Sequence, residues 1–252
     1  MSGWVKDLVG AEHDQPPRRF GLQRSYLVCS TPRSGSSLLC RGLSSTGVLG
    51  TPLEYFNPGC RQLLSERWGC GEELDDYLAA LHDRRTGPGG VFGAKVHWAQ
   101  LDEPRQAAGL DPGELLERLA PGARFVRIAR EDRDAQAVSL WRALRSGIWS
   151  VASGDELAAD APAYDFEAID ECRRQVERGE LAWDWLLAEL GQRPVTVTYE
   201  ELAVDHAATV RQVARALGAE TVEVGPPNTR RLADERSREL VDSFRDEFRR
   251  RG

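Results

Sequence analysis

Residues 25–43 decide the fold, and they read SYLVCSTPRSGSSLLCRGL. The run Ser25–Cys29 is short and apolar, as a buried parallel strand would be. A polar turn rich in serine follows, and Leu38, Leu39 and Leu43 then recur at helical spacing. A strand, a polar loop and a helix in this order are typical of the first unit of an α/β fold.

The rest of the chain continues this alternation of strands and helices. We predict further strands over residues 91–98, 124–129 and 194–199. We predict helices over residues 131–147 and 166–190, the second with a weak point at Gly179. Two short helices should follow up to Gly218, and the charged tail should form a last helix. The pattern predicts a central parallel sheet with helices on both faces. We expect one domain over residues 24–252, preceded by a polar arm over residues 1–23.

The carboxyl ends of the strands are where a sheet of this kind binds its ligands. Residues 30–37, 95–98 and Arg130 each follow or end a predicted strand. We therefore expect these three segments to meet at one rim of the sheet.

The loop Ser30–Ser37 has the character of an anion site. A loop between a strand and a helix points backbone N–H groups at a bound anion. In the nucleotide-binding pattern G-x-x-x-x-G-K-[ST], Gly35 and Ser37 fit, whereas Ser36 replaces the lysine and Arg33 is the cation. A kinase or ATPase needs Mg²⁺ and that lysine, so the sequence favours an anion with less charge at its reacting end. A plain polar turn is the alternative.

The composition narrows the classes of function. A net charge of −7 disfavours a nucleic-acid partner. The five cysteines include no C-x-x-C pair and the four histidines lie far apart, so we expect neither a disulfide framework nor a metal site. No run of about 18 apolar residues predicts a membrane span, and no signal peptide is evident. A cytoplasmic protein is the default expectation.

Four motifs follow one another along the chain: TPRSGSS at 31–37, GTPLEYF at 50–56, GAKVHW at 93–98 and REDRDAQAVSLWRA at 130–143. The first resembles the 5′-phosphosulfate loop of sulfotransferases that use 3′-phosphoadenosine 5′-phosphosulfate (PAPS), and the last resembles their 3′-phosphate motif. All four, in this order, resemble the bacterial trehalose 2-sulfotransferase family. The resemblance covers residues 25–245.

This resemblance implies a P-loop-like sulfotransferase fold and a metal-free reaction. The sulfuryl group of PAPS would pass to a hydroxyl of a small acceptor, a carbohydrate or a glycosylated metabolite, leaving adenosine 3′,5′-bisphosphate. The resemblance also favours a homodimer. The residues that it implies for cofactor binding are Pro32, Arg33, Ser34, Gly35, Ser36, Ser37, Arg130, Ser139 and Arg231. For Arg130, an ion pair with Asp132 or Asp134 is the structural alternative.

Glu54 is the candidate general base, a role that the family resemblance implies. A positioned carboxylate can take the proton of an attacking hydroxyl. Its neighbours Leu53, Tyr55 and Phe56 are apolar, so we expect desolvation to raise its pKa and its basicity.

His97 is the rival base, and a core histidine is its structural alternative. The resemblance favours Lys95 as a cation near the sulfuryl group, and we expect Lys95 and His97 on opposite faces of their strand. The catalytic set is thus Glu54, Arg33, Lys95 and His97. Tyr55, Phe56 and Trp98 are candidates, with Glu54, for contact with the acceptor.

Two other functions stay open at this stage. A P-loop-type small-molecule kinase would require Mg²⁺ and nucleoside triphosphate. A non-catalytic nucleotide-binding module would bind adenosine 3′,5′-bisphosphate without turning over any hydroxyl acceptor.

Overall fold

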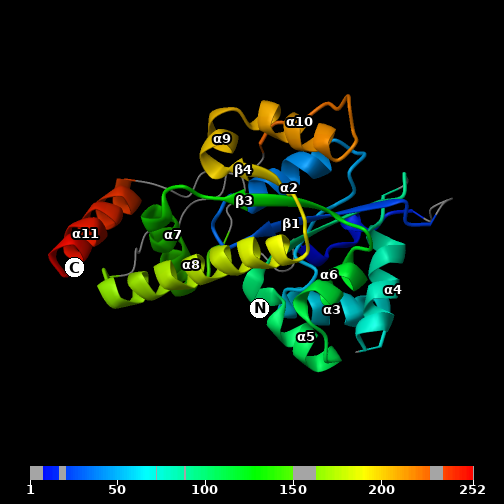
Figure 1. The fold of residues 1–252 in the computed structure, drawn as a ribbon, viewed down its shortest axis with the longest axis horizontal. Helices are drawn as coiled ribbons and strands as arrows, with labels where there is room; N and C mark the ends of the chain where they lie inside the picture. Colours follow the sequence, from blue (N-terminus) through cyan, green and yellow to red (C-terminus); the bar gives the residue numbers. More distant parts are fainter. Residues whose placement is uncertain are drawn as a thin grey trace.

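The computed structural model describes residues 8–16, 21–71, 73–87, 89–149, 163–227 and 235–251. Within them, four parallel strands form a sheet in the order β2–β1–β3–β4 (Figure 1). The strands are β1 (Arg24–Ser30), β2 (Val91–His97), β3 (Arg124–Ala129) and β4 (Val195–Thr198). The predicted parallel sheet is confirmed, and β1, which leads into the loop, lies in its interior.

Alternate residues of β1 enter two different cores. Tyr26 and Val28 pack in one cluster and Leu27 and Cys29 in another. The first cluster includes residues of α2 (Ser36–Ser45), α9 (Tyr199–Val204) and α10 (His206–Ala216). The second includes residues of α3 (Pro58–Trp68), α4 (Leu74–Arg85), α6 (Pro112–Leu119) and α8 (Phe166–Glu189). Because successive strand residues point to opposite faces, helices cover both faces, as predicted (Figure 1).

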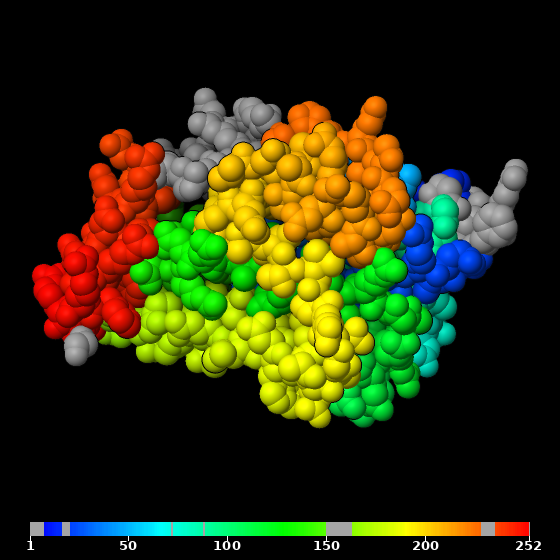
Figure 2. Space-filling view, turned by 45° about the horizontal axis from the view of Figure 1, so that its top comes forward, coloured from blue at the N-terminus to red at the C-terminus, as the bar shows by residue number. Residues whose placement is uncertain are grey.

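A third buried cluster lies beyond the sheet. It joins α7 (Arg133–Ser146), the first half of α8 and α11 (Glu235–Arg251). The apolar stripe of the charged tail enters it, with Leu240, Val241 and Phe244 buried. Figures 1 and 2 show α11 at one end of the molecule, beside α7 and the start of α8.

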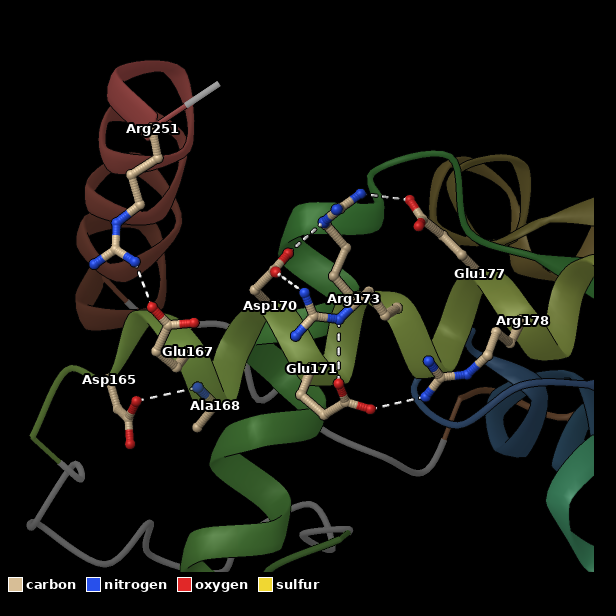
Figure 3. A network of polar contacts seen from close by, with 10 residues as sticks. Asp165, Glu167, Ala168, Asp170, Glu171, Arg173, Glu177, Arg178 and Arg251 are labelled. Atoms are coloured by element: carbon tan, nitrogen blue, oxygen red, sulfur yellow. Dashed lines mark hydrogen bonds and ion pairs between the residues drawn. The ribbon is translucent and has the colours of Figure 1, made fainter.

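A ladder of ion pairs runs along α8, with exposed partners around the buried Asp170, and is drawn in Figure 3. Arg251 of α11 reaches Glu167 at the start of the helix and ties the two helices together. Exposed pairs of this kind are worth about 0–1 kcal/mol each. The others in the ladder join Asp170 to Arg173 and Arg174, Glu171 to Arg174 and Arg178, and Arg173 to Glu177.

Three short helical elements remain to be placed. After β2 the chain forms η2 (Trp98–Gln100) and α5 (Asp102–Ala108), and the N-terminal part contains η1 (Ala11–His13). Asp14, which follows η1, pairs with Arg85 of α4 at 3.2 Å. The Arg85 side chain is 0 % exposed and lies against the Tyr55 ring, so this N-terminal contact supports the segment that carries Glu54.

Helix α8 is continuous through Gly179, so the expected weak point is wrong. A Cβ at position 179 would lie 2.9 Å from the Cγ2 of Thr31. Glycine is therefore needed there for the close approach of α8 to the loop after β1, and the neighbouring turns of the helix hold its backbone in place.

A buried ion pair fixes this approach. Arg127 of β3 and Glu180 of α8 are 2.6 Å apart, and their side chains are 5 % and 4 % exposed. Glu180 also accepts a hydrogen bond of 2.5 Å from the Thr31 hydroxyl. The carboxylate thus joins β3, α8 and the loop, in surroundings where an unpaired charge would be costly.

We expect Glu180→Gln to lower the free energy of unfolding by about 2–3 kcal/mol, because the buried Arg127 guanidinium loses its closest charged partner and keeps only the exposed Asp184 carboxylate, at 3.2 Å. Denaturant unfolding followed by circular dichroism measures this. Arg178→Gln, on an exposed face of the same helix, is the matched control and should change stability by less than about 0.5 kcal/mol. Equal effects of the two substitutions would contradict the assignment.

Candidate functional site

The loop between β1 and α2 turns through two residues with left-handed backbone conformations. Arg33 has a φ of 65°, and Gly35, the N-cap of α2, has a φ of 85°. A Cβ at position 35 would also lie 2.6 Å from the Tyr199 ring, so both backbone conformation and space require glycine. Among the residues that the structure describes, no side chain caps α2, and its first amides are therefore left for an anion at the helix N-terminus.

Three helical side chains hold the loop from behind. Trp183 of α8 donates from Nε1 to the carbonyl of Ser30 at 2.9 Å. Gln136 of α7 donates from Nε2 to the Thr31 hydroxyl at 2.9 Å and to the Pro32 carbonyl at 2.8 Å. With the Glu180 contact to Thr31, these bonds fix the first residues of the loop and leave its inner side to Arg33 and the serines.

Arg33 turns toward α7. Its Nε donates to the Ser139 hydroxyl at 2.9 Å, and its Nη1 donates to the carbonyl of Trp149. Burial, and after it the nearby positive charge of Arg130, lower the pKa of Arg33 to about 10. Two cations placed this close favour an anion between or beside them.

Arg130 follows β3 directly. Its guanidinium lies 4.8 Å from the centre of the Tyr199 ring. The carboxylates considered as alternative partners, Asp132 and Asp134, instead pair with Arg245 of α11. The structure thus brings Arg33, Arg130 and Ser139 to one side of the loop, with Ser139 bonded to Arg33.

The serines of the loop differ in their surroundings. Ser34 is 0 % exposed, and its hydroxyl has no hydrogen-bond partner within the described residues. Ser36 is buried at the start of α2, and Ser37 is exposed. An unused buried hydroxyl, uncapped helix amides and two arginines form a donor set that fits a phosphosulfate.

Glu54 lies against the outer edge of β2. Leu53 forms an isolated parallel bridge with Ala94, and its carbonyl accepts a hydrogen bond of 2.9 Å from the Lys95 amide. The Oε1 of Glu54 is 2.6 Å from Nζ of Lys95 and 3.5 Å from Nε2 of His97. Lys95 and His97 therefore lie on the same side of β2, and the expectation of opposite faces is wrong, because strand residues two apart share a face.

This cluster is connected to both ends of the loop. Nζ of Lys95 donates to the Ser37 hydroxyl at 2.8 Å, and Nδ1 of His97 lies 3.0 Å from the Ser30 hydroxyl. Gln100 completes the cluster by donating to Oε2 of Glu54 at 2.7 Å. One ammonium group thus joins the candidate base to the anion loop.

The pKa of Glu54 is the opposite of what its sequence neighbours led us to expect. Burial alone would raise it, but Lys95 and then His97 outweigh the burial and hold the pKa of Glu54 well below its usual range. The expectation of raised basicity is wrong because it counted only adjacent residues, whereas the ammonium comes from the neighbouring strand. Glu54 is ionised, and Lys95 moderates its basicity.

The aromatic candidates fall into two groups. Tyr55 and Phe56 are each 1 % exposed and lie in the core, where Tyr55 stacks on Phe92. Their burial leaves no ring face for an acceptor, which corrects their assignment, and they support Glu54 instead. Trp98 is half-buried, packed edge-on against Trp183, at the rim where β2 ends.

Some site residues had weak signals or none in the sequence. Tyr199 follows β4 and contacts both Gly35 and Arg130, and its place after a strand was the available clue. Gln136 stands inside a motif, but Glu180 and Gln100 stand in none. Arg231, the remaining predicted cofactor residue, lies outside the described residues.

Across the described part of the chain, no three His, Cys, Asp or Glu side chains are grouped so that they could hold a metal ion. None of the helices described combines the length and hydrophobicity of a membrane span.

The chain is similar to known proteins over most of its length. The family model described as Stf0 sulphotransferase matches residues 25–247. A trehalose 2-sulfotransferase of Mycobacterium tuberculosis is 32 % identical over 260 residues, covering 91 % of this chain and 97 % of that protein. A trehalose 2-sulfotransferase of Mycolicibacterium smegmatis is 29 % identical, with 90 % and 97 % covered. The chain belongs to the Stf0 sulphotransferase family.

Proposed function

We propose that the chain transfers the sulfuryl group of PAPS to a hydroxyl of a small acceptor, a carbohydrate or a glycosylated metabolite. The observation that carries the proposal is the Lys95 ammonium, which bonds both to Glu54 and to Ser37 of the loop. A candidate base and an anion site joined in this way are what the transfer of an anionic group to a hydroxyl requires. The names of the two mycobacterial relatives support a sugar as acceptor.

The donor half of the site would consist of the loop and α7. Residues 32–37 would hold the 5′-phosphosulfate through backbone amides, the Ser34 hydroxyl and Arg33. Arg130 and Ser139 would hold the 3′-phosphate, with Arg33 exchanging its bond to Ser139 for the anion. Charge-assisted bonds of this kind are worth roughly 1.5–3 kcal/mol each. Arg231 is proposed from family resemblance as a further cofactor contact.

PAPS, when bound, supplies an activated sulfuryl group. The residues of the chain would stabilise negative charge and accept a proton during the transfer. Glu54 is ionised and would accept the proton of the attacking hydroxyl. Lys95 and Arg33 would stabilise the negative charge that grows on the transferred group and the leaving phosphate. As Lys95 turns to the growing negative charge, its ion pair with Glu54 would weaken. The pKa of Glu54, and with it the basicity of the carboxylate, would then rise.

His97 is proposed as a positioning residue for Glu54. Its Nδ1 lies beside Ser30 and its Nε2 beside Glu54, so it connects the base to the start of the loop. The same geometry also lets it serve as the base, and the substitutions below separate the two roles.

We expect adenosine 3′,5′-bisphosphate to bind in the micromolar range in the presence of a metal chelator, because arginines and amides supply the positive charge. Titration calorimetry measures this. A preference for ATP with Mg²⁺ would favour the small-molecule kinase instead. Binding without turnover of any hydroxylated metabolite would favour a non-catalytic nucleotide-binding module.

Arg130→Ala should weaken the binding of adenosine 3′,5′-bisphosphate by about 1.5–3 kcal/mol, which is roughly a ten- to more than hundredfold loss of affinity. Adenosine 5′-phosphosulfate, which lacks the 3′-phosphate, should bind almost as before. Paired titrations of the two ligands provide the comparison, and equal losses for both would mean that Arg130 has a structural role.

Glu54→Gln should lower kcat by about 10²–10⁴ while nucleotide affinity survives, because the amide keeps its size but accepts no proton. His97→Ala is the paired variant and should reduce kcat less. The thermal midpoint of each variant controls for the buried Lys95 charge that Glu54→Gln leaves unpaired. Near-normal kcat in Glu54→Gln with loss of turnover in His97→Ala would assign the base to His97.

A further inference from the structure

Two carboxylates closely follow Arg130, the proposed 3′-phosphate residue, in the chain. Asp132 and Asp134 begin α7 directly after Arg130, and their side chains are 40 % and 33 % exposed. The two acids lie two and four residues after Arg130 in the chain. A phosphate held at Arg130 would therefore lie in the field of both negative charges, most strongly at low salt, where the Debye length is longer.

Arg245, from the C-terminal helix α11, pairs with both carboxylates. Nη2 of Arg245 lies 2.6 Å from Oδ1 of Asp132, and its Nε lies 3.0 Å from Oδ2 of Asp134. The hydrogen bond with Asp134 is the first cause that raises the pKa of Arg245. The planar guanidinium is suited to this double contact, and it sets one positive charge against two negative ones.

The other polar contacts here join side-chain carboxylates to backbone amides. Oδ1 of Asp132 also accepts the Ala135 amide at 3.0 Å and caps α7. The Glu200 carboxylate accepts the amides of Glu131 and Asp132. Glu200 therefore adds a further negative charge close to Arg130, which makes neutralisation of the two aspartates more important.

Arg245 is not what holds α11 in place. Leu240, Val241 and Phe244 bury the apolar stripe of α11, and Arg251 pairs with Glu167 of α8 (Figure 3). Removal of the Arg245 charge should therefore leave the helix docked.

We propose that Arg245 is a positioning residue for the donor: it neutralises Asp132 and Asp134 and holds them on the α11 side of α7, so that a 3′-phosphate can bind at Arg130 and Ser139. The inference rests on the proposed function, because it takes Arg130 and Ser139 as the 3′-phosphate site. It assigns a role in donor binding to the C-terminal helix through charge alone, without contact between Arg245 and the nucleotide.

The test compares two ligands that differ in the 3′-phosphate. Arg245→Met keeps an apolar side chain and removes the charge. It should lower the affinity for adenosine 3′,5′-bisphosphate about three- to tenfold at low salt. Adenosine 5′-phosphosulfate should bind with unchanged affinity. Arg249→Met is the matched control on the same helix, since Arg249 pairs with Asp246 at an exposed position, and it should affect neither ligand.

A charge rescue separates electrostatics from packing. Adding Asp134→Asn to Arg245→Met should restore most of the affinity that Arg245→Met loses. Arg245→Lys, which keeps the charge, should retain more than half of the original affinity. A loss that is equal for the two ligands, or that the Asn substitution does not rescue, would overturn the inference. If Arg130→Ala is selective for the 3′-phosphate and Arg245→Met is not, this inference fails alone. If Arg130→Ala also lowers the affinity for both ligands equally, the proposed 3′-phosphate site is wrong, and the inference about Arg245, which depends on that site, is wrong as well.

Discussion

The loop after β1 is the constraint on which the other parts of the molecule depend. Arg33 is held in a left-handed backbone conformation, which costs an L-residue about 1–2 kcal/mol. Such a conformation persists where the surroundings over-determine it. Here Trp183 and Glu180 of α8 and Gln136 of α7 bond to the residues just before Arg33. The packing of α7 and α8 therefore sets the shape of the loop that follows β1.

Two buried ion pairs flank this loop, and their surroundings make them different. Arg127 and Glu180 lie behind it, where they also bond to Asp184 of α8 and to the Thr31 hydroxyl and so fix β3, α8 and the loop together. Lys95 and Glu54 lie where the loop meets β2, and the ammonium also bonds to Ser37. A pair with a third partner at an anion site can redistribute its bonds when charge arrives. In the proposed reaction, the buried ion pair on one side of the loop would serve rigidity and the pair on the other side would serve reactivity.

Patterns local in sequence predicted what is local in space. The strand over residues 124–129 and the start of α8 at Phe166 lie where the apolar pattern placed them, and Arg33 stands out as the cation of a polar turn. Contacts across the fold left no such pattern, since Thr31 and Glu180 are 149 residues apart. The pKa of Glu54 was misjudged for the same reason: its sequence neighbours are apolar, while its spatial neighbours are Lys95 and His97.

The donor and acceptor halves of the site are attached to the sheet in different ways. The proposed donor half is built on β1 and β3 and the loops that follow them, so a change there would disturb the sheet interior. The Glu54 segment is joined to the outer strand β2 through the bridge between Leu53 and Ala94. An edge attachment of this kind can accommodate changes of sequence without altering strand order. We therefore expect that substitutions around Glu54 can change the acceptor preference while the proposed phosphosulfate loop keeps its geometry, with Lys95 joining the two proposed halves.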